Sequence, residues 1–377
     1  MKLVLFANTD WYLYNFRRSL ALGAQAAGHE VLLVSPPGPY GQKLVDLGLR
    51  WMPAPMERRS LNPLREAALL HWLWRLARSE KADVVHGFTI KCVVYGALSA
   101  RLAGAARVNA VAGMGYVFIS DEPKARALRP IVRGLLRMAL GGRRARLVLQ
   151  NEDDFALFTK AGLAASENIR LIPGSGVDCE RFAPNSGERS GPFNVVLAAR
   201  MLWDKGVSEF IEAARALKGQ GRNIRFVLAG TPDPGNPATI PEEVLNEWQS
   251  SGLVDWLGHV DDMPKLFADA DVVALPSYRE GLPKSLIEAA ACGCALITTD
   301  VPGCRSVVTD GVDGLLVPAR NFVDLAEAIA RLQDDPALAR RLGDSARSKA
   351  LAQYDERIIV ARTLAVYEEL VAGSDAD

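Results

Sequence analysis

Short apolar runs alternate with longer segments of helical periodicity along most of the chain. The first such helical segment is Phe16–Ala27, and Gly28 after it is typical of a helix stop. Apolar runs without internal polar alternation, joined by helices, predict parallel strands that are buried on both faces. The predicted strands are Leu3–Ala7, Val31–Ser35, Val84–His86, Val108–Val111 and Leu147–Leu149, then Asn194–Ala198, Phe226–Ala229, Asp255–Leu257, Asp271–Leu275, Ala295–Thr298 and Gly314–Val317.

The alternation occurs twice, which predicts two domains. A chain of 377 residues is longer than one ordinary core requires. Strands joined by right-handed helical crossovers give the α/β fold class, here two doubly wound, Rossmann-like domains. The stretch Pro173–Pro192 is rich in Gly and Pro and is the predicted linker. We expect an N-terminal domain over residues 1–175, a C-terminal domain over 190–350, and a small-molecule site in a cleft between them.

Composition narrows the class of protein. With 49% hydrophobic and 23% charged residues, the chain is typical of globular proteins. The apolar start Leu3–Ala7 is interrupted by Asn8 and Asp10, so it predicts a buried strand and not a signal peptide. No apolar run reaches the roughly 18–20 residues of a membrane span. Five cysteines without paired spacing favour reduced thiols in a cytosolic protein.

The net charge of zero hides an asymmetry between the two halves. Residues 1–190 include 26 basic and 16 acidic residues, whereas residues 191–377 include 18 basic and 28 acidic residues. A basic first half predicts an anionic partner: a membrane, a phosphorylated acceptor or nucleic acid. Nucleic acid is disfavoured, because no zinc spacing, recognition-helix signature or RNA-binding aromatic motif accompanies the charge.

The basic residues are densest between residues 124 and 146, where eight occur without an acid. Four of them recur at spacings of three, four and four, so they share one face of a helix. With leucines on the remaining faces, this predicts a helix lying in a lipid interface. A core-packed helix with a solvated basic face is the alternative, since Pro130 and Gly134 interrupt the pattern. The predicted membrane residues are Arg126, Arg129, Arg133 and Arg137.

Two segments of the second half have the residues of an anion site. A strand ending at Leu275 is followed by Glu280 and Gly281, and a helix is predicted from Pro283 to about Cys292. The free N–H groups at its start favour an anion. Earlier, Arg200 and Lys205 follow another strand. A planar guanidinium and a point-charge ammonium together suit a diphosphate.

Together these segments resemble the family 4 retaining glycosyltransferases of the two-domain GT-B fold. The first half is similar to the narrower bacterial group that extends lipid-linked surface polysaccharides. The matching motifs are Gly176-Val177-Asp178, Arg200 with Lys205-Gly206, Ala229-Gly230, Leu257-Gly258, Pro276-Ser277, the pair Glu280 and Glu288, and Asp300-Val301-Pro302-Gly303, together with Trp11–Arg17, Val85–Thr89, Lys91 and Gly113–Tyr116 in the first half.

The resemblance implies a sugar transfer from a nucleotide-sugar, a UDP-sugar such as UDP-GlcNAc, UDP-GalNAc or UDP-Gal, to a lipid-diphosphate-linked glycan. Arg200 and Lys205 are then expected to hold the diphosphate and stabilise its leaving charge. Glu280 is expected to orient the sugar and Glu288 to bind the ribose. The further implied residues are Gly230, Thr231, His259, Val260, Gly281, Leu282, Pro283 and Lys284 on the donor side, and Trp11, Tyr12, Asn15, Arg17, His86, Lys91 and Tyr116 on the acceptor side.

The same resemblance implies transfer on one face of the sugar, with the leaving diphosphate taking the acceptor proton. It also implies a C-terminal helix, about 355–371, that packs back on the first domain, and attachment to the inner face of the cytoplasmic membrane. Neither metal nor cofactor is expected. Asp269-Ala270-Asp271 resembles a metal-binding DxD, but it precedes an apolar strand, which favours a helix end.

One departure concerns the loop Gly113–Tyr116, where many relatives carry a His and this chain has none. His86 either replaces that His in part or is a buried structural residue.

The alternative on the same fold is a UDP-sugar 2-epimerase or hydrolase, which needs several acid–base groups around the sugar. The chain has four His and none in the Glu280 segment, which disfavours it. An oxidoreductase is disfavoured because Asn8–Trp11 replaces the GxGxxG turn.

Overall fold

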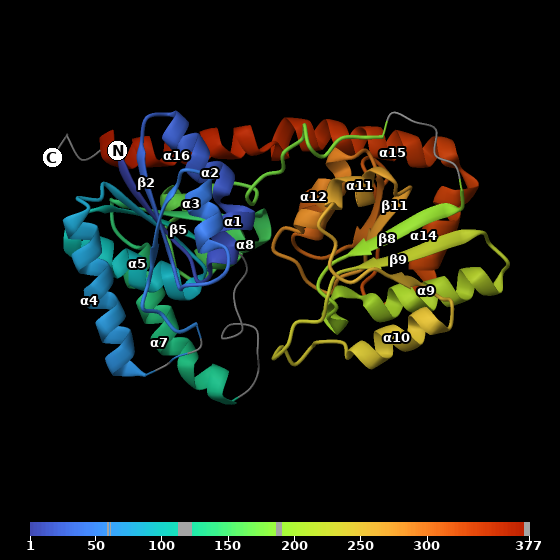
Figure 1. Ribbon diagram of the computed structural model, residues 1–377, viewed down its shortest axis with the longest axis horizontal. Helices are drawn as coiled ribbons and strands as arrows, with labels where there is room; N and C mark the ends of the chain where they lie inside the picture. Colours follow the sequence, from blue (N-terminus) through green and yellow to red (C-terminus); the bar gives the residue numbers. More distant parts are fainter. Residues whose placement is uncertain (59, 61, 112–122, 186–190, 373–377) are drawn as a thin grey trace. The chain divides into compact units, whose positions relative to one another are not determined.

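The computed structural model describes residues 1–58, 60, 62–111, 123–185 and 191–372, without the side chains of 123–128 and 131. It divides the chain into two compact units (Figure 1). The first consists of residues 1–175 together with the segment that begins at Glu356, and the second of Gly176–Asp355. The boundary at Ser175 lies inside the stretch predicted as a linker. Val177, Cys179 and Phe182, from that same stretch, are buried in the core of the second unit.

The described part of the first unit contains one parallel sheet of seven strands, in the order β3-β2-β1-β4-β5-β6-β7. Chain order therefore reverses between β1 and β4, which are hydrogen-bonded neighbours. This is the strand order of a doubly wound fold, extended by one edge strand. The strands are β1 (Lys2–Phe6), β2 (Glu30–Ser35), β3 (Arg50–Pro53), β4 (Val84–Phe88), β5 (Ala106–Ala110), β6 (Ala145–Leu149) and β7 (Ile169–Leu171).

Helices cover both faces of this sheet, which explains the uninterrupted apolar runs. Leu3 and Leu5 of β1 belong to the core cluster beneath α1, α2, α3 and α16. Val4 and Phe6 point to the other face, toward α4 and α5. The helices are α1 (Asp10–Phe16), α2 (Arg18–Ala26), α3 (Gly41–Asp46), α4 (Pro63–Ser79), α5 (Ile90–Ala103), α7 (Pro123–Leu140), α8 (Glu152–Lys160) and α16 (Glu356–Ala372).

The C-terminal helix α16 packs on α2 of the first unit, with the two helices side by side (Figure 1). Ser19 hydrogen-bonds the Glu356 carboxylate at one end of α16. At the other end, Glu369 pairs with Arg146 at 2.6 Å and with Arg170 at 2.5 Å. Burial would raise the pKa of Glu369, and the hydrogen bonds from the two arginines outweigh it and lower that pKa. The helix is therefore held by apolar packing along its length, by a hydrogen bond at its start and by ion pairs near its end.

The second unit contains a six-stranded parallel sheet in its described residues, in the order β10-β9-β8-β11-β12-β13. Here the reversal falls between β8 and β11, where Val195 and Val196 pair with Val272 and Val273. The strands are β8 (Phe193–Ala198), β9 (Ile224–Ala229), β10 (Asp255–Trp256), β11 (Val272–Leu275), β12 (Ala295–Thr299) and β13 (Leu315–Val317).

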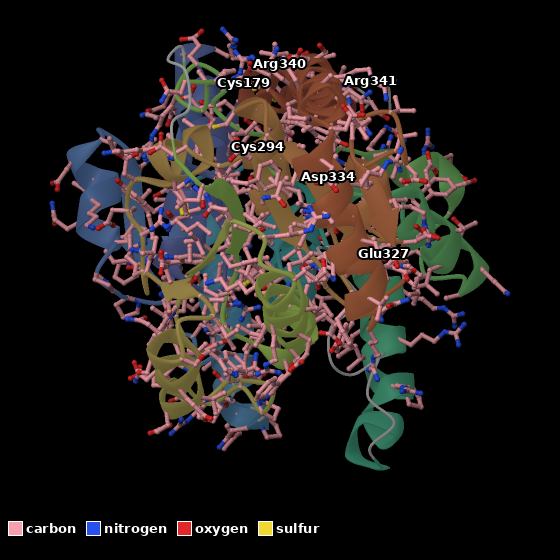
Figure 2. The ribbon with its side chains drawn as sticks, turned by 90° about the vertical axis from the view of Figure 1, so that its right-hand side faces the viewer. Cys179, Cys294, Glu327, Asp334, Arg340 and Arg341 are labelled. Atoms are coloured by element: carbon pink, nitrogen blue, oxygen red, sulfur yellow. The ribbon has the colours of Figure 1, made fainter. Side chains whose placement is uncertain are left out.

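The helices α14 and α15 of the second unit each have one buried and one charged face. Leu325, Ile329 and Leu332 of α14 are buried against the sheet. Glu327 and Asp334 of α14 and Arg340 and Arg341 of α15 are exposed, and Figure 2 shows them on the outer side of these helices. The helices are α9 (Val207–Gly219), α10 (Glu242–Ser250), α11 (Met263–Ala268), α12 (Lys284–Ala291), α13 (Cys304–Val307), α14 (Phe322–Asp334) and α15 (Pro336–Lys349).

The predicted strands and fold class are confirmed. The predicted helix Phe16–Ala27 corresponds to α2, which begins two residues later, at Arg18. The helix before it, α1, was not predicted, and the chain breaks at Arg17 between the two. Arg17 has φ −128° and ψ 0°, outside the helical region. The edge strands β3 and β7 were not predicted. None of the described helices combines the length and hydrophobicity that a membrane span requires.

Two glycines inside helices should respond oppositely to alanine. A Cβ on Gly23 of α2 would lie 2.5 Å from Val360 Cγ1 of α16, whereas no atom of the described residues lies within 4 Å of a Cβ on Gly134 of α7. Overpacking costs about 1–3 kcal/mol, and Gly→Ala in a helix gains about 0.5–1 kcal/mol. We expect Gly23→Ala to lower the denaturant midpoint and Gly134→Ala to raise it.

Adding Val360→Ala to the Gly23→Ala variant should recover the loss by removing the clash. If Gly23→Ala leaves the midpoint unchanged or raises it, the close packing of α2 on α16 is wrong.

Candidate functional site

The loops that follow β8 and β11 meet at the carboxyl edge of the second sheet, where its strand order reverses. Lys205 comes from the first loop and Glu280 from the second, and their Nζ and Oε1 atoms are 2.6 Å apart. Both side chains are largely buried, at 16% and 13% exposure. Tyr278 N and Ser277 Oγ both donate to the Asp204 carbonyl, at 2.9 and 3.1 Å. The two predicted donor-site segments are therefore joined into one structure.

Two glycines allow this close approach of backbones. Gly206 has φ +72°, and a Cβ there would lie 2.0 Å from the Pro276 carbonyl oxygen. Gly303 has φ +80°, and a Cβ there would lie 2.5 Å from the carbonyl oxygens of Glu280 and Gly281. Because only glycine tolerates both the left-handed backbone and the contact, these positions fix where Glu280 and Gly281 lie.

Arg200 lies on the β8 loop in a more exposed position than Lys205. Its Nη1 contacts Asp233 Oδ2 at 2.5 Å, and its side chain is 61% exposed. Exposed ion pairs contribute little stability, so this arginine can exchange Asp233 for another anion at small cost. Gly230, before Asp233, has φ +139°, and a Cβ there would lie 1.8 Å from the Ala199 carbonyl oxygen.

Glu288 lies one turn into α12, beside the loop that carries Glu280. Its Oε1 is 3.3 Å from Lys284 Nζ. Burial raises the pKa of the Glu288 carboxyl above its ordinary value, and the Lys284 charge offsets this only in part. Pro283 is the residue before the first helical one, a single position from its predicted place. A largely buried carboxylate of this kind is able to accept hydrogen bonds from ligand hydroxyls.

The other predicted donor residues occupy the neighbouring loops of the same edge. The Thr231 carbonyl accepts from Met201 N at 3.0 Å, which ties the β9 loop to the β8 loop. His259 is 71% exposed and lies 3.2 Å from Asp261, and Val260 packs against the core cluster that also contacts Leu282.

The aspartates that resemble DxD lie at the start of β11, at the strand end opposite to Glu280. Asp269 is the residue after α11, and its Oδ1 accepts from Asn185. Asp271 Oδ2 accepts from Asn194 N at 2.8 Å. Their interpretation as a helix end and strand start is confirmed.

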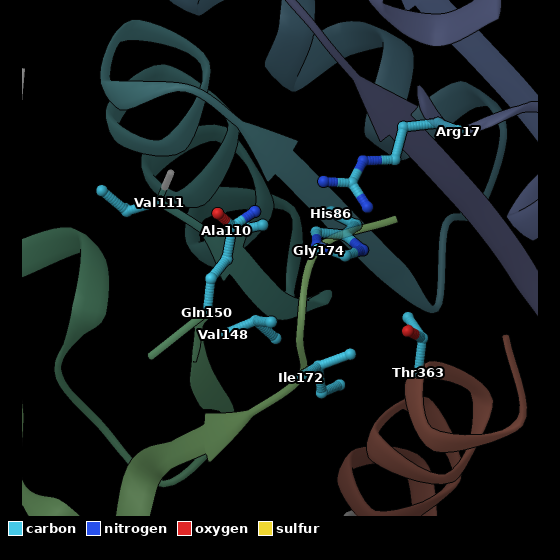
Figure 3. Close-up of a pocket in the computed structure, with 9 residues that line it drawn as sticks. All are labelled: Arg17, His86, Ala110, Val111, Val148, Gln150, Ile172, Gly174 and Thr363. Atoms are coloured by element: carbon cyan, nitrogen blue, oxygen red, sulfur yellow. The ribbon is translucent and has the colours of Figure 1, made fainter. Parts of the chain in front are cut away.

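Residues predicted for the acceptor side meet at the reversal point of the first sheet, near β1 and β4. Arg17 is 7% exposed, and its guanidinium carbon lies 4.3 Å from the Phe88 ring centroid. Its Nη2 donates to Tyr12 Oη at 2.9 Å. His86, at 2% exposure, lines the same small pocket as Arg17 (Figure 3). Trp11 and Asn15 are on the exposed side of α1.

Lys91 has local partners that its prediction as an acceptor residue did not include. Its ammonium contacts Glu66 Oε1 at 2.8 Å and the carbonyl oxygens of Glu57 and Ser60 at 2.8 and 3.2 Å. These contacts use all three of its N–H donors, so binding an acceptor would require Lys91 to leave them. Tyr116 lies outside the described residues.

Arg133 and Arg137, two of the predicted membrane arginines, bind backbone carbonyls within the fold. Arg137 Nε donates to the Gly162 carbonyl at 2.8 Å, and Arg133 donates to the Ala161 carbonyl. These carbonyls end α8, where cations are favourable. Leu136, Ala139 and Leu140 are buried, so this end of α7 packs on the core and does not present its apolar face outward, as the lipid-interface prediction required. The side chain of Arg126 is outside the described part.

Family models match both units. A glycosyl transferase 4-like domain matches residues 15–173, and glycosyl transferases group 1 matches residues 178–349. An N,N'-diacetylbacillosaminyl-diphospho-undecaprenol alpha-1,3-N-acetylgalactosaminyltransferase of Campylobacter jejuni is 31% identical over 98% of this chain and 99% of its own length. The chain belongs to the glycosyltransferase family that these two models and the Campylobacter jejuni enzyme represent.

Further comparisons agree with that assignment. An Escherichia coli UDP-Gal:alpha-D-GlcNAc-diphosphoundecaprenol alpha-1,3-galactosyltransferase is 26% identical over 81% of the chain and 80% of its own length. The solved structure of Anabaena HepE with UDP has a TM-score of 0.78 at 21% identity, covering 97% of this chain and all of that one. The structure of sucrose-phosphate synthase of Thermosynechococcus elongatus has a TM-score of 0.79 at 19% identity, covering 99% of this chain and 100% of that one. The glycosyltransferase therefore has the GT-B fold.

Several residues around the two reversal points were not predicted. In the second unit this is Asp233, the partner of Arg200; Gly303 belongs to a motif named from the sequence, but no role in the site was predicted for it. In the first unit, Gln150, Thr363 and Tyr367 lie around the Arg17 pocket. Gln150 directly follows a predicted strand, so its position in the sequence was a usable signal. Thr363 and Tyr367 lie on α16, and nothing local in the sequence connects them with β4.

The raised pKa of Glu288 predicts a pH-dependent effect of Glu288→Gln on stability. Ionising this carboxyl costs more in the folded than in the unfolded state. That cost is absent below the unfolded pKa, about 4.5, and complete above the folded pKa. We expect Glu288→Gln to raise the free energy of unfolding more at pH 8 than at pH 4.5, by about 1.4 kcal/mol per pKa unit.

Denaturant unfolding at the two pH values measures this. Glu212→Gln is the matched control, because Glu212 is an exposed carboxylate on α9. An equal effect of Glu288→Gln at both pH values would show that the carboxyl is not perturbed.

Proposed function

We propose that this glycosyltransferase moves a hexose or N-acetylhexosamine from a UDP-sugar to a saccharide linked through a diphosphate to a lipid, in polysaccharide biosynthesis. The observation that supports this most is the 31% identity, over nearly both full lengths, to a transferase whose acceptor is a diphospho-undecaprenol saccharide. A second relative is named for UDP-Gal and for an acceptor of the same kind. The UDP complex of a structural neighbour supports a uridine donor.

The geometry of the second unit suits a nucleotide-sugar donor. Lys205 and Glu280 form a pair at the strand-order reversal, the usual ligand position in open α/β sheets. We assign the donor diphosphate to Arg200 and Lys205, the sugar to Glu280 with the Gly281–Lys284 backbone, and the ribose to Glu288. Both cations now face carboxylates, so a bound diphosphate would take over part of their charge compensation.

We further propose that transfer retains the anomeric configuration and requires no metal. Two cations and the N-terminus of α12 supply the positive charge that the leaving diphosphate needs. In that mechanism the leaving phosphate oxygen accepts the acceptor proton, and no carboxylate forms a covalent intermediate.

A donor panel tests the function. Nucleotide release from UDP-, GDP- and ADP-sugars is measured with and without a diphosphate-linked lipid saccharide, each with and without EDTA, and the anomeric configuration of the product is read by NMR. Acceptor-dependent UDP release that persists in EDTA supports the proposal. Release of free sugar without an acceptor would favour the hydrolase or epimerase alternative.

The two cations should contribute differently to turnover and stability. We expect Arg200→Ala and Lys205→Ala each to lower turnover by roughly 10²–10³-fold, the scale of losing one group that stabilises developing charge. Arg200→Ala should leave the unfolding midpoint unchanged because its side chain is exposed. Lys205→Ala should lower that midpoint, because it leaves Glu280 with its charge uncompensated.

Arg215→Ala, at an exposed arginine of α9, is the control. Near wild-type turnover of both variants would contradict the diphosphate assignment.

We also propose that the enzyme works at the inner face of the cytoplasmic membrane and that α7 contacts anionic lipid. The support is the basic composition of α7 and the lipid-linked acceptors of the relatives. Arg133 and Arg137 remain exposed although they bind the end of α8. The contact then relies on charge, at about 1 kcal/mol per basic residue near the surface, and the buried leucines do not take part.

Sedimentation with neutral and anionic liposomes tests this contact. Arg126→Glu with Arg129→Glu should weaken binding to anionic liposomes by roughly tenfold or more, in a salt-sensitive way. Arg75→Glu with Arg78→Glu, on the exposed face of α4, is the matched control. Equal binding of both double variants would exclude α7 as the contact.

A further inference from the structure

The first unit contains a small pocket at the point where its strand order reverses. Arg17, from the break between α1 and α2, and His86, from β4, point into it (Figure 3). Both side chains are more than nine-tenths buried, and each has a nitrogen for which the described residues provide no hydrogen-bond partner: Arg17 Nε and His86 Nε2. Unpaired buried nitrogens cost stability unless a ligand or water satisfies them. The other lining residues are Ala110, Val111, Val148, Gln150, Ile172, Gly174 and Thr363.

The partner of the other His86 nitrogen decides what Nε2 offers. His86 Nδ1 lies 2.6 Å from the hydroxyl of Tyr367 on α16. Burial lowers the pKa of His86 well below its ordinary value, and the Arg17 charge adds to this, so the ring is neutral. If the tyrosine donates to Nδ1, only Nε2–H is left unpaired. With the proton on Nδ1 instead, both the tyrosine proton and the Nε2 lone pair would lack a partner. The tautomer with the proton on Nε2 is therefore favoured.

Arg17 has no carboxylate partner within the described part of the chain. Its recorded contacts are the Tyr12 hydroxyl and the rings of Tyr12 and Phe88. The cations of the second unit's site, by contrast, each face a carboxylate. A buried cation without a counter-charge, next to a neutral N–H donor, is an environment that favours an anionic oxygen.

The backbone next to His86 is strained. Thr89 follows β4 with φ +73° and ψ 153°, a region that β-branched residues rarely enter. The surrounding contacts, including Thr89 N to the Ala110 carbonyl at 3.3 Å, hold it there. This strain fixes the end of β4 close to His86.

We infer that Arg17 and His86 bind one anionic oxygen of the acceptor's diphosphate, with Tyr367 as a positioning residue that sets the His86 tautomer. The pocket is about the size of one oxygen atom, so it holds a single phosphoryl oxygen and not a whole phosphate. This inference rests on the proposed function for the identity of the ligand. The site itself rests only on the two unpaired nitrogens and the charge.

Calorimetric titration of the full chain with pyrophosphate and with a short prenyl diphosphate tests the site. We expect Arg17→Gln to raise the dissociation constant of each diphosphate at this pocket by about 10–100-fold, the scale of one charged hydrogen bond. Arg18→Gln, at the adjacent residue outside the pocket, should leave it unchanged. His86→Asn keeps a partner for Tyr367 but removes the Nε2 donor, so it should weaken diphosphate binding by about tenfold. His86→Gln retains a donor near that position and should weaken binding less.

The tautomer of His86 is a second measurement, which a purely structural role of Tyr367 would not change. Long-range ¹⁵N–¹H spectra of histidine-labelled protein should show His86 as neutral with the proton on Nε2. Tyr367→Phe should shift the population toward Nδ1–H and weaken diphosphate binding.

The outcomes separate this inference from the proposed function. Arg17-dependent diphosphate binding without any sugar transfer would leave the site standing and overturn the transferase proposal. Transfer with an unchanged acceptor KM in Arg17→Gln and His86→Asn would overturn the site and leave the function. A proton on Nδ1, or binding that is the same in all variants, would show that the pocket holds only a structural water. Arg17-dependent binding of pyrophosphate without Arg17-dependent binding of the prenyl diphosphate would overturn the acceptor assignment.

Discussion

Parallel strands cannot be joined by tight turns, and this constraint determines where both sites of the molecule lie. Each crossover places a helix on one face of the sheet, and the direction of winding reverses once. At the reversal, between β1 and β4 in one unit and between β8 and β11 in the other, the loops diverge to opposite faces. The carboxyl ends of these strands are therefore left uncovered by the connections, and the candidate site of each unit lies near them.

The two reversal points differ in how their charge is balanced. In the second unit, Lys205 and Arg200 face Glu280 and Asp233, so the site is electrically compensated before any ligand arrives. An incoming diphosphate must compete with carboxylates, which favours a ligand that offers several anionic oxygens at once. In the first unit, Arg17 is surrounded by aromatic rings and a hydroxyl, and its charge is stabilised by polarisable groups. A single oxygen is enough to complete that site.

Features whose cause lies within one short segment could be predicted from the sequence, and features that depend on contacts with other segments could not. The central strands were predictable because burial on both faces leaves an apolar run within one short segment. The edge strands β3 and β7 were not, because Arg50 and Arg170 interrupt them and only pairing with a neighbour makes them strands. The break at Arg17 was missed because helical periodicity continues through it. In the fold, the Arg17 side chain contacts the Tyr12 hydroxyl and the Phe88 ring.

The same reasoning applies to the candidate sites. Lys205 and Glu280 were predictable as partners because each follows a strand, and strand ends meet at one edge. The link from His86 to Tyr367 joins residues 281 positions apart, and no local pattern in the sequence contains it. For α7, the basic stripe was visible, but its partners were not. Arg133 and Arg137 bind carbonyls that end α8, and a backbone carbonyl has no signature in the sequence.

The charge asymmetry of the sequence also acquires a different meaning in the fold. The acidic half includes residues 356–377, with five acidic and two basic residues, and this segment belongs to the basic unit. Glu369 neutralises Arg146 and Arg170, so part of the positive excess serves to hold α16 in place. Since α16 also carries Tyr367, the ionic contacts at its end support the hydroxyl that orients His86. Basic residues that suggested an anionic partner from the sequence thus act first on the protein's own C-terminal helix, and through it on the Arg17 pocket.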